Sequence, residues 1–90
     1  MVRILQDLKF KKGGQVGEIL AESPIPEGAT IENVVRYRMV DHFDGDIVQG
    51  VRAIDEASGY EIYRWTRWDE QESRSERALK KLRQTAQDEL

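Results

Sequence analysis

Residues 34–68 have the sequence VVRYRMVDHFDGDIVQGVRAIDEASGYEIYRWTRW, which predicts three consecutive antiparallel strands joined by two tight turns. Asp44-Gly45 is a dipeptide favoured in two-residue type I′ hairpins, because both central residues of that turn adopt positive φ. The segment EASG at 56–59 fits a type I turn closed by a glycine in the left-handed region. The stretch therefore predicts a three-stranded meander.

The turns also fix the expected register and faces of this meander. Counting outward from the second turn gives the pairs Val51–Trp65, Ala53–Tyr63 and Ile54–Ile62. The face that carries the Ile54–Ile62 pair is predicted to be the core face, although Arg52 and Arg64 share it. The opposite face is too apolar for a face in water, so we expect another element or a partner to cover part of it.

The segments on either side predict a hairpin, an irregular connection and a helix. Apolar residues alternate from Val2 to Phe10, the turn KKGG follows at 11–14, and residues 16–22 favour a second strand over a short helix. Pro24, Pro26 and Gly28 mark residues 23–33 as a Pro-rich connection.

The sequence DEQESRSERALKKLRQTAQDEL at 69–90 predicts a C-terminal helix from about residue 70 to the late eighties. Asp69 with Glu72 three residues later has the form of a capping box. The apolar stripe of this helix is thin and consists of Ala78, Leu79, Leu82, Ala86 and Leu90. We therefore expect the helix either to dock by its second half or to project freely.

These elements predict a single α+β domain over residues 1–90. Its parts are an N-terminal β-hairpin (1–22), the connection (23–33), the meander (34–68) and the C-terminal helix (69–90). About five strands form a small antiparallel sheet, which is either open or curled into an SH3-like or OB-like barrel.

The composition is that of an ordinary soluble domain, with 34% charged and 39% hydrophobic residues. A net charge of −3 argues against a general nucleic-acid binder, which is usually basic. The chain has no cysteine, which excludes a disulfide framework and a thiolate metal site. The N-terminal residues do not resemble a signal peptide and no run is long enough to span a membrane, so we expect a cytoplasmic protein without membrane contact.

No motif predicts catalysis, a metal or a cofactor, and we expect a protein that is not an enzyme. His42 lies near three aspartates at the first predicted turn, where it could act as a base or help bind a cation, but aspartates are common in turns. Gly13, Gly14 and Gly17 lack the spacing of a phosphate loop, and the serines lack a triad order with His42.

The most informative cluster is a group of arginines and aromatic residues on one face of the predicted meander. Its members, which we predict to bind a partner, are Arg36, Arg38, Tyr63, Trp65 and Arg67. Arginine beside exposed aromatic residues is typical of protein-interface hot spots, and also of surfaces that stack single-stranded nucleic acid. Cation–π contacts within an ordinary surface are the structural alternative.

We therefore expect a small non-enzymatic module that docks on another protein. A regulator or inhibitor from a mobile genetic element would suit this profile. One alternative is a nucleic-acid-binding module that uses the same Arg/aromatic face. A second is a small assembly subunit that pairs through its C-terminal helix, so that formation of a homo-oligomer stays open.

Overall fold

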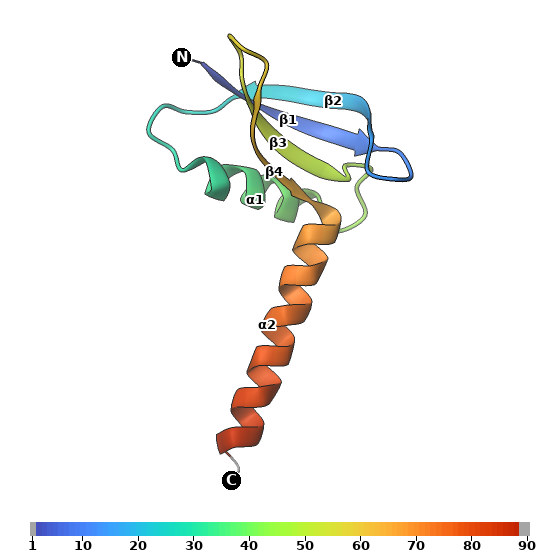
Figure 1. The fold of residues 1–90 in the computed structure, drawn as a ribbon, viewed down its shortest axis with the longest axis vertical. Helices are drawn as coiled ribbons and strands as arrows, with labels where there is room; N and C mark the ends of the chain where they lie inside the picture. Colours follow the sequence, from blue (N-terminus) through green and yellow to red (C-terminus); the bar gives the residue numbers. More distant parts are fainter. Residues whose placement is uncertain (1, 89–90) are drawn as a thin grey trace.

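The computed structural model describes residues 2–88, with side chains described through residue 84. Figure 1 shows a twisted antiparallel sheet, one helix packed against it and a second helix that extends away from it. The elements in chain order are β1 (Arg3–Phe10), β2 (Val16–Pro24), α1 (Ile31–His42), β3 (Gly50–Asp55), β4 (Glu61–Thr66) and α2 (Arg67–Asp88). The α+β class and the helix after the strands are confirmed.

The sheet has four strands in the order β2-β1-β3-β4, instead of the five that were predicted. The two predicted hairpins, β1–β2 and β3–β4, form, and β1 joins them by pairing with β3. Pro24 ends the edge strand β2, where its missing N–H interrupts no pairing on the outer side. The four strands lie in one linear order, and the predicted alternative of a closed barrel is not confirmed.

The register of the β3–β4 hairpin follows the prediction up to one bulge. Val51 pairs with Trp65 and Ala53 with Tyr63, as expected, whereas Ile54 pairs with Glu61 instead of Ile62. The reversal between the strands is closed by a hydrogen bond of 2.7 Å from the amide of Gly59 to Asp55, with Gly59 at a φ of 74°. The bulge between Ala53 and Ile54 accommodates one extra residue, so the observed partner of Ile54 differs by one from the predicted register.

The first strand of the predicted meander is wrong, because residues Ile31–His42 form the helix α1. Val35 and Met39 are four apart, so they share a face in a helix as well as in a strand. Tyr37 separates the two patterns: it would share their face in a strand, yet it is 70% exposed and lies on the outer side of α1. Asp44-Gly45 consequently follows the end of a helix, where Gly45 has a φ of 79°, and does not form a hairpin.

Helix α1 covers the sheet face opposite the predicted core face, where partial cover by another element or a partner was expected. Val35 and Met39 are fully buried on this face, against Val51 and Ala53 of β3. The core cluster of buried residues is Leu5, Ile25, Val35, Met39, Val48, Val51 and Ala53, with Tyr63 and Trp65 packed at its margin. The predicted faces are therefore reversed, and the face with Arg52 and Arg64 is not covered by a helix.

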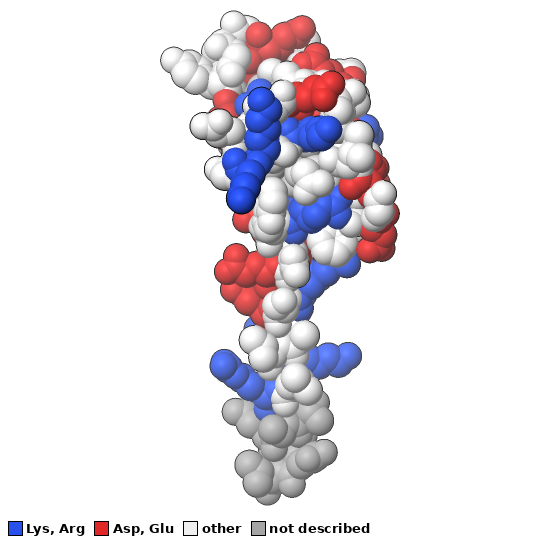
Figure 2. Space-filling view, turned by 90° about the vertical axis from the view of Figure 1, so that its right-hand side faces the viewer, with Lys and Arg blue, Asp and Glu red and all other residues white. Residues whose placement is uncertain are grey.

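Helix α2 begins at a capping box that lies three residues earlier than predicted. The hydroxyl of Thr66 accepts a hydrogen bond of 3.1 Å from the amide of Asp69, and the Asp69 carboxylate accepts one of 2.9 Å from the amide of Thr66. From there the helix projects as a narrow stalk below the broader sheet domain (Figure 2). The predicted apolar stripe also includes Ala86 and Leu90, whose side chains lie outside the described part of the chain.

Candidate docking surfaces

The structure brings together only part of the predicted partner-binding cluster. Arg36 of α1 lies over the Trp65 ring, with its guanidinium carbon 4.3 Å from the ring centroid. Tyr63 and Trp65 of β4 are half-buried and pack against the core. Arg38 and Arg67 point to other partners, so the five residues do not form one continuous surface.

Arg38 belongs to a buried charge network that ties the end of α1 to β1. It donates hydrogen bonds of 3.2 and 2.8 Å to the carboxylate of Asp7, which is 3% exposed. This contact with Asp7 raises the pKa of Arg38. A ring nitrogen of His42 lies 3.2 Å from the same carboxylate. Loss of the Arg38 charge or of the His42 contact would leave Asp7 with less compensation for its burial.

His42 lies between two carboxylates and not in an open site. Its Nδ1 is 2.5 Å from Asp46, and its Nε2 faces Asp7. The hydrogen bond from His42 lowers the pKa of Asp46. Both ring nitrogens contact carboxylates, so the His42 side chain links α1 to β1 and to the loop that follows α1. Within residues 2–88, no group of three or more acidic, histidine or cysteine side chains is arranged to hold a metal ion.

Arg67 joins the two helices through backbone carbonyls. Its guanidinium donates to the carbonyl oxygens of His42 at 2.9 Å, Val48 at 2.6 Å and Asp46 at 3.1 Å, and also to that of Phe43. The last carbonyls of a helix have no partner within the helix. Arg67 therefore satisfies the C-terminal end of α1 and fixes the loop that leads to β3.

A buried glutamate holds the base of α2 against β4. Glu70 is 3% exposed and accepts a hydrogen bond of 3.1 Å from the indole nitrogen of Trp65. Arg74 and Arg77 lie 3.1 and 3.5 Å from its other oxygen. Burial alone would raise the pKa of Glu70, but the Trp65 hydrogen bond and the two arginines outweigh it, and the pKa lies below its ordinary value.

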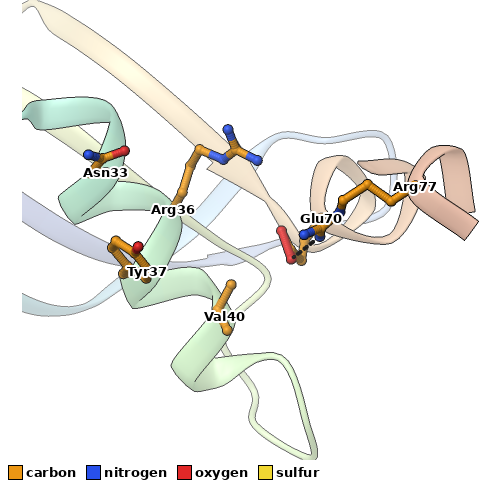
Figure 3. A pocket seen from close by; sticks show the side chains of 6 residues that line it. All are labelled: Asn33, Arg36, Tyr37, Val40, Glu70 and Arg77. Carbon is orange, nitrogen blue, oxygen red and sulfur yellow. Dashed lines mark ion pairs between the residues drawn. The ribbon is translucent and has the colours of Figure 1, made fainter. Parts of the chain in front are cut away.

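A cavity of about 270 Å³ lies between α1 and α2 beside this glutamate. Figure 3 shows its lining residues, which are Asn33, Arg36, Tyr37, Val40, Glu70 and Arg77, with the Glu70–Arg77 ion pair at one end. The lining has no cysteine or serine nucleophile and no histidine. The arrangement can exchange polar contacts with a partner, and it provides no nucleophile–base pair of the kind that covalent catalysis needs.

The sheet face that no helix covers carries a chain of polar side chains across all four strands. Gln6 donates to Glu22 at 2.6 Å and accepts from Arg52 at 2.7 Å. Glu61 lies 3.7 Å from Arg52 and 2.6 Å from Arg64. Because these charges compensate one another, this face is suited to contact with water as it stands.

Helix α2 is different, because its apolar side chains lack cover. Leu79 is 56% exposed and Leu82 is 67% exposed. Both lie beyond the base of the helix, where Glu70 and Arg74 contact the sheet domain. The described part of the predicted stripe, Ala78, Leu79 and Leu82, therefore lies exposed on a projecting helix, in the second of the two arrangements that were expected.

A second exposed surface lies at the β1–β2 turn. A groove of about 420 Å³ is lined by Lys9, Phe10, Lys11, Lys12, Gly13, Asp46, Ile47, Gln49 and Trp68. Trp68 is 53% exposed and stacks on Phe10, with ring centroids 6.1 Å apart. This groove was not predicted from sequence, although Trp68 at the start of the predicted helix and the three lysines of LKFKK at 8–12 were available signals.

Comparison with known protein families, curated proteins and solved structures gave no significant match. The two candidate surfaces, the leucine-bearing face of α2 and the groove at the β1–β2 turn, are therefore interpreted from the structure alone. Within residues 2–88 no helix is both long and apolar enough to cross a bilayer.

Proposed function

We propose that this chain is a non-enzymatic protein-binding module that docks on another protein through α2. The observation that carries the proposal is the exposure of Leu79 and Leu82 on a helix that extends away from the domain (Figure 1). A partner helix with its own apolar stripe is the occupant that fits this surface.

Helical stability in proteins comes mostly from packing of an apolar face, since an isolated helix is marginal in water. The second half of α2 has no such packing within the described residues, because residues 74–84 are all exposed. Docking on a partner helix would bury both leucines and stabilise the helix in the same step. A small domain that presents one docking helix suits a regulatory or inhibitory role. Because the chain has no cysteine, it forms no disulfide that would need an oxidising compartment, which fits a role in the cytoplasm.

The predicted binding residues Arg36 and Trp65 enter this proposal as the edge of the docking surface at the base of α2. Arg36 lines both the cavity between the helices and a second hollow, whose other lining residues are Trp65, Asp69, Glu72, Ser73 and Glu76. Its charge lies where a partner that runs along α2 would meet the domain.

The test is affinity capture from the native host with the wild-type chain and with the double variant Leu79→Glu/Leu82→Glu. Glutamate keeps a high helix propensity, so the variant changes the surface of α2 more than its conformation. We expect specific partners to be recovered with the wild type and lost with the variant. Amides 78–84 should also exchange hydrogen more slowly in the recovered complex than in the free chain.

The matched control is Lys80→Ala, which changes an exposed residue of the same turn but leaves both leucines. This variant should retain the wild-type partners. Identical partners with the leucine double variant and the wild type would contradict a docking role for α2.

The groove at the β1–β2 turn, which is lined by Lys9, Lys11 and Lys12, favours a second candidate function, binding of single-stranded nucleic acid. None of Lys9, Lys11 and Lys12 has an ion-pair partner among the described residues, whereas Arg38, Arg52 and Arg64 all have one. Unpaired cations beside an exposed indole suit a strand whose phosphates bind the lysines while a base stacks on the ring.

A fluorescence titration with single-stranded oligonucleotides tests this candidate. Binding should fall steeply with salt, because each phosphate contact releases a counterion, and it should be lost in Lys11→Glu/Lys12→Glu. Absence of binding at low salt would eliminate the nucleic-acid function and leave the protein-docking proposal unchanged.

A further inference from the structure

We infer that the partner of α2 is α2 of a second copy of this chain, paired antiparallel so that Glu76 of each copy faces Arg83 of the other. This inference rests on the proposed function, because it names the partner of the same docking helix.

The apolar stripe of α2 points away from its own domain. Glu70, Arg74 and Arg77 lie on one side of the helix, where they form the contacts to Trp65 and Phe43 and line the cavity. With 3.6 residues per turn, Leu79 and Leu82 are centred about 150° around the helix from that side. The sheet domain of the same chain therefore does not cover them, and whatever packs on this stripe is another molecule.

Charge along α2 is divided between its two halves. Residues 67–76 contain four acidic and two basic residues, for a net charge of −2, whereas residues 77–88 contain four basic residues and one acidic residue, for a net charge of +3. Figure 2 shows acidic side chains near the top of the stalk and basic ones farther down. An antiparallel second copy would place the basic half of one helix beside the acidic half of the other, which gives charge complementarity.

The same register satisfies the apolar and the charged positions. Two helices related by a two-fold axis exchange equivalent residues about one centre. The pair Leu79 and Leu82 is centred between residues 80 and 81, and the pair Glu76 and Arg83 is centred one position earlier. Leu79 of each copy would thus pack on Leu82 of the other, while Glu76 and Arg83, on the same flank of the stripe, would meet across the pair.

A parallel pair would lack these contacts. In a parallel pair the acidic halves would lie together and the basic halves would lie together, with repulsion in both. Glu76 would lie next to the acidic half and Arg83 next to the basic half. The order of charges along the helix therefore selects the antiparallel arrangement, and the short apolar stripe makes it a weak, concentration-dependent dimer.

Sedimentation equilibrium over a concentration series of the full chain tests the pairing. The wild-type chain should change from monomer to dimer, and Leu79→Glu/Leu82→Glu should stay monomeric. Gln84→Ala, which changes an exposed uncharged residue on the side of α2 opposite the leucines, should retain the dimer. Circular dichroism at low concentration checks that each variant keeps its fold.

Charge reversal tests the register. Glu76→Arg alone and Arg83→Glu alone each create two repulsive contacts in an antiparallel homodimer, and we expect each to weaken dimerisation about tenfold. The double variant Glu76→Arg/Arg83→Glu should recover the wild-type constant. An equimolar mixture of the two single variants should also recover it, because both cross-pairs in the mixed dimer are then opposite in charge.

Two results would overturn the inference. A monomeric mass for the wild type at the highest soluble concentration removes self-pairing, and a dimer that the charge reversals do not weaken removes this register. Loss of self-pairing together with leucine-dependent capture of a different protein would leave the proposed function in place. Loss of both would remove α2 as a docking element.

Discussion

The sheet domain and the outer half of α2 are stabilised in opposite ways. In the sheet domain, Leu8, Val35, Met39 and Val51 are fully buried, and no buried polar side-chain atom among the described residues lacks a hydrogen-bond partner. Along α2 beyond residue 74, every described side chain is exposed. The sheet domain is therefore stabilised by its own packing, whereas the apolar side chains of the outer half of α2 would be buried only by another molecule.

The same substitution in both regions should give the largest contrast. Leu8→Ala removes a fully buried side chain, and we expect it to lower the free energy of unfolding by about 3–4 kcal/mol. Leu82→Ala removes a side chain that is 67% exposed and should change that free energy by less than about 0.5 kcal/mol in the monomer. Urea unfolding at low protein concentration measures both values. Equal losses would mean that α2 is packed against its own domain in solution.

Replacement of the arginine that joins the two regions should have a smaller effect. Arg67→Ala leaves the carbonyls at the end of α1 without their donor, and we expect a loss of about 2–3 kcal/mol in the free energy of unfolding. Arg83→Ala is the matched control on the exposed half of α2 and should be close to neutral at a protein concentration where the chain is monomeric. If Arg67→Ala proved equally neutral, the loop after α1 would have to be held by other contacts.

The boundary between domain and stalk can be weakened at the capping box. Thr66→Ala removes the hydroxyl that accepts from the amide of Asp69 and should lower the free energy of unfolding by about 1 kcal/mol. Ser75→Ala, in the middle of the helix, serves as the control and should not destabilise the chain, because alanine is the better helix former. Urea unfolding followed by circular dichroism compares the two variants, and a loss with Ser75→Ala as large as that with Thr66→Ala would argue against the cap.

The smallest expected effect is a pH dependence at the base of α2. The pKa of Glu70 is lowered in the folded state, so the charged form is favoured by folding. The corresponding stability is present above the ordinary pKa of 4.5 and is lost as the pH falls through the lower folded-state pKa. Glu70→Gln should therefore reduce stability at neutral pH by less than about 1 kcal/mol, since Arg74 and Arg77 are largely exposed.

Unfolding of the wild type and of Glu70→Gln at a series of pH values between neutral and acid isolates this contribution. The difference between the two proteins should shrink as the pH falls. A constant difference across the series would assign the effect of the variant to packing and not to charge.

The sequence predicted well those features that depend on neighbouring residues. The two hairpins, the pairs Val51–Trp65 and Ala53–Tyr63, and the C-terminal helix all follow from turn chemistry and periodicity within short windows. The capping box was misplaced by one helical turn, because Thr66 serves as the last residue of β4 and as the cap of α2 at once.

The sequence of α1 is compatible with two secondary structures, and this ambiguity produced the main error. Val35 and Met39 fit a strand and a helix equally, and the β-branched neighbours together with Asp44-Gly45 favoured the strand. What selects the helix is burial of Val34, Val35 and Met39 against β3 and β4, a contact between distant segments. The reversed faces follow from the same error, since the covering element had been counted as part of the sheet.

The predicted binding cluster shows the same limit. The register of the predicted meander placed Arg36, Arg38 and Arg67 on one face, but Arg36 and Arg38 lie on a helix. Only tertiary contacts show that Arg38 compensates Asp7 and that Arg67 binds carbonyl groups. The thin stripe of α2 could be predicted from spacing, but sequence left open whether the helix docks by its second half or projects, and the exposure of Leu79 and Leu82 selects projection.

By itself, the sequence determined the hairpins, the C-terminal helix with its thin stripe, and the order of charges along it, because turns, helix periodicity and charge spacing are local properties. Only the tertiary structure decided that residues 31–42 are a helix, which sheet face is covered, and which arginines are already engaged. These depend on packing between segments far apart in the chain, where burial outweighs local preference.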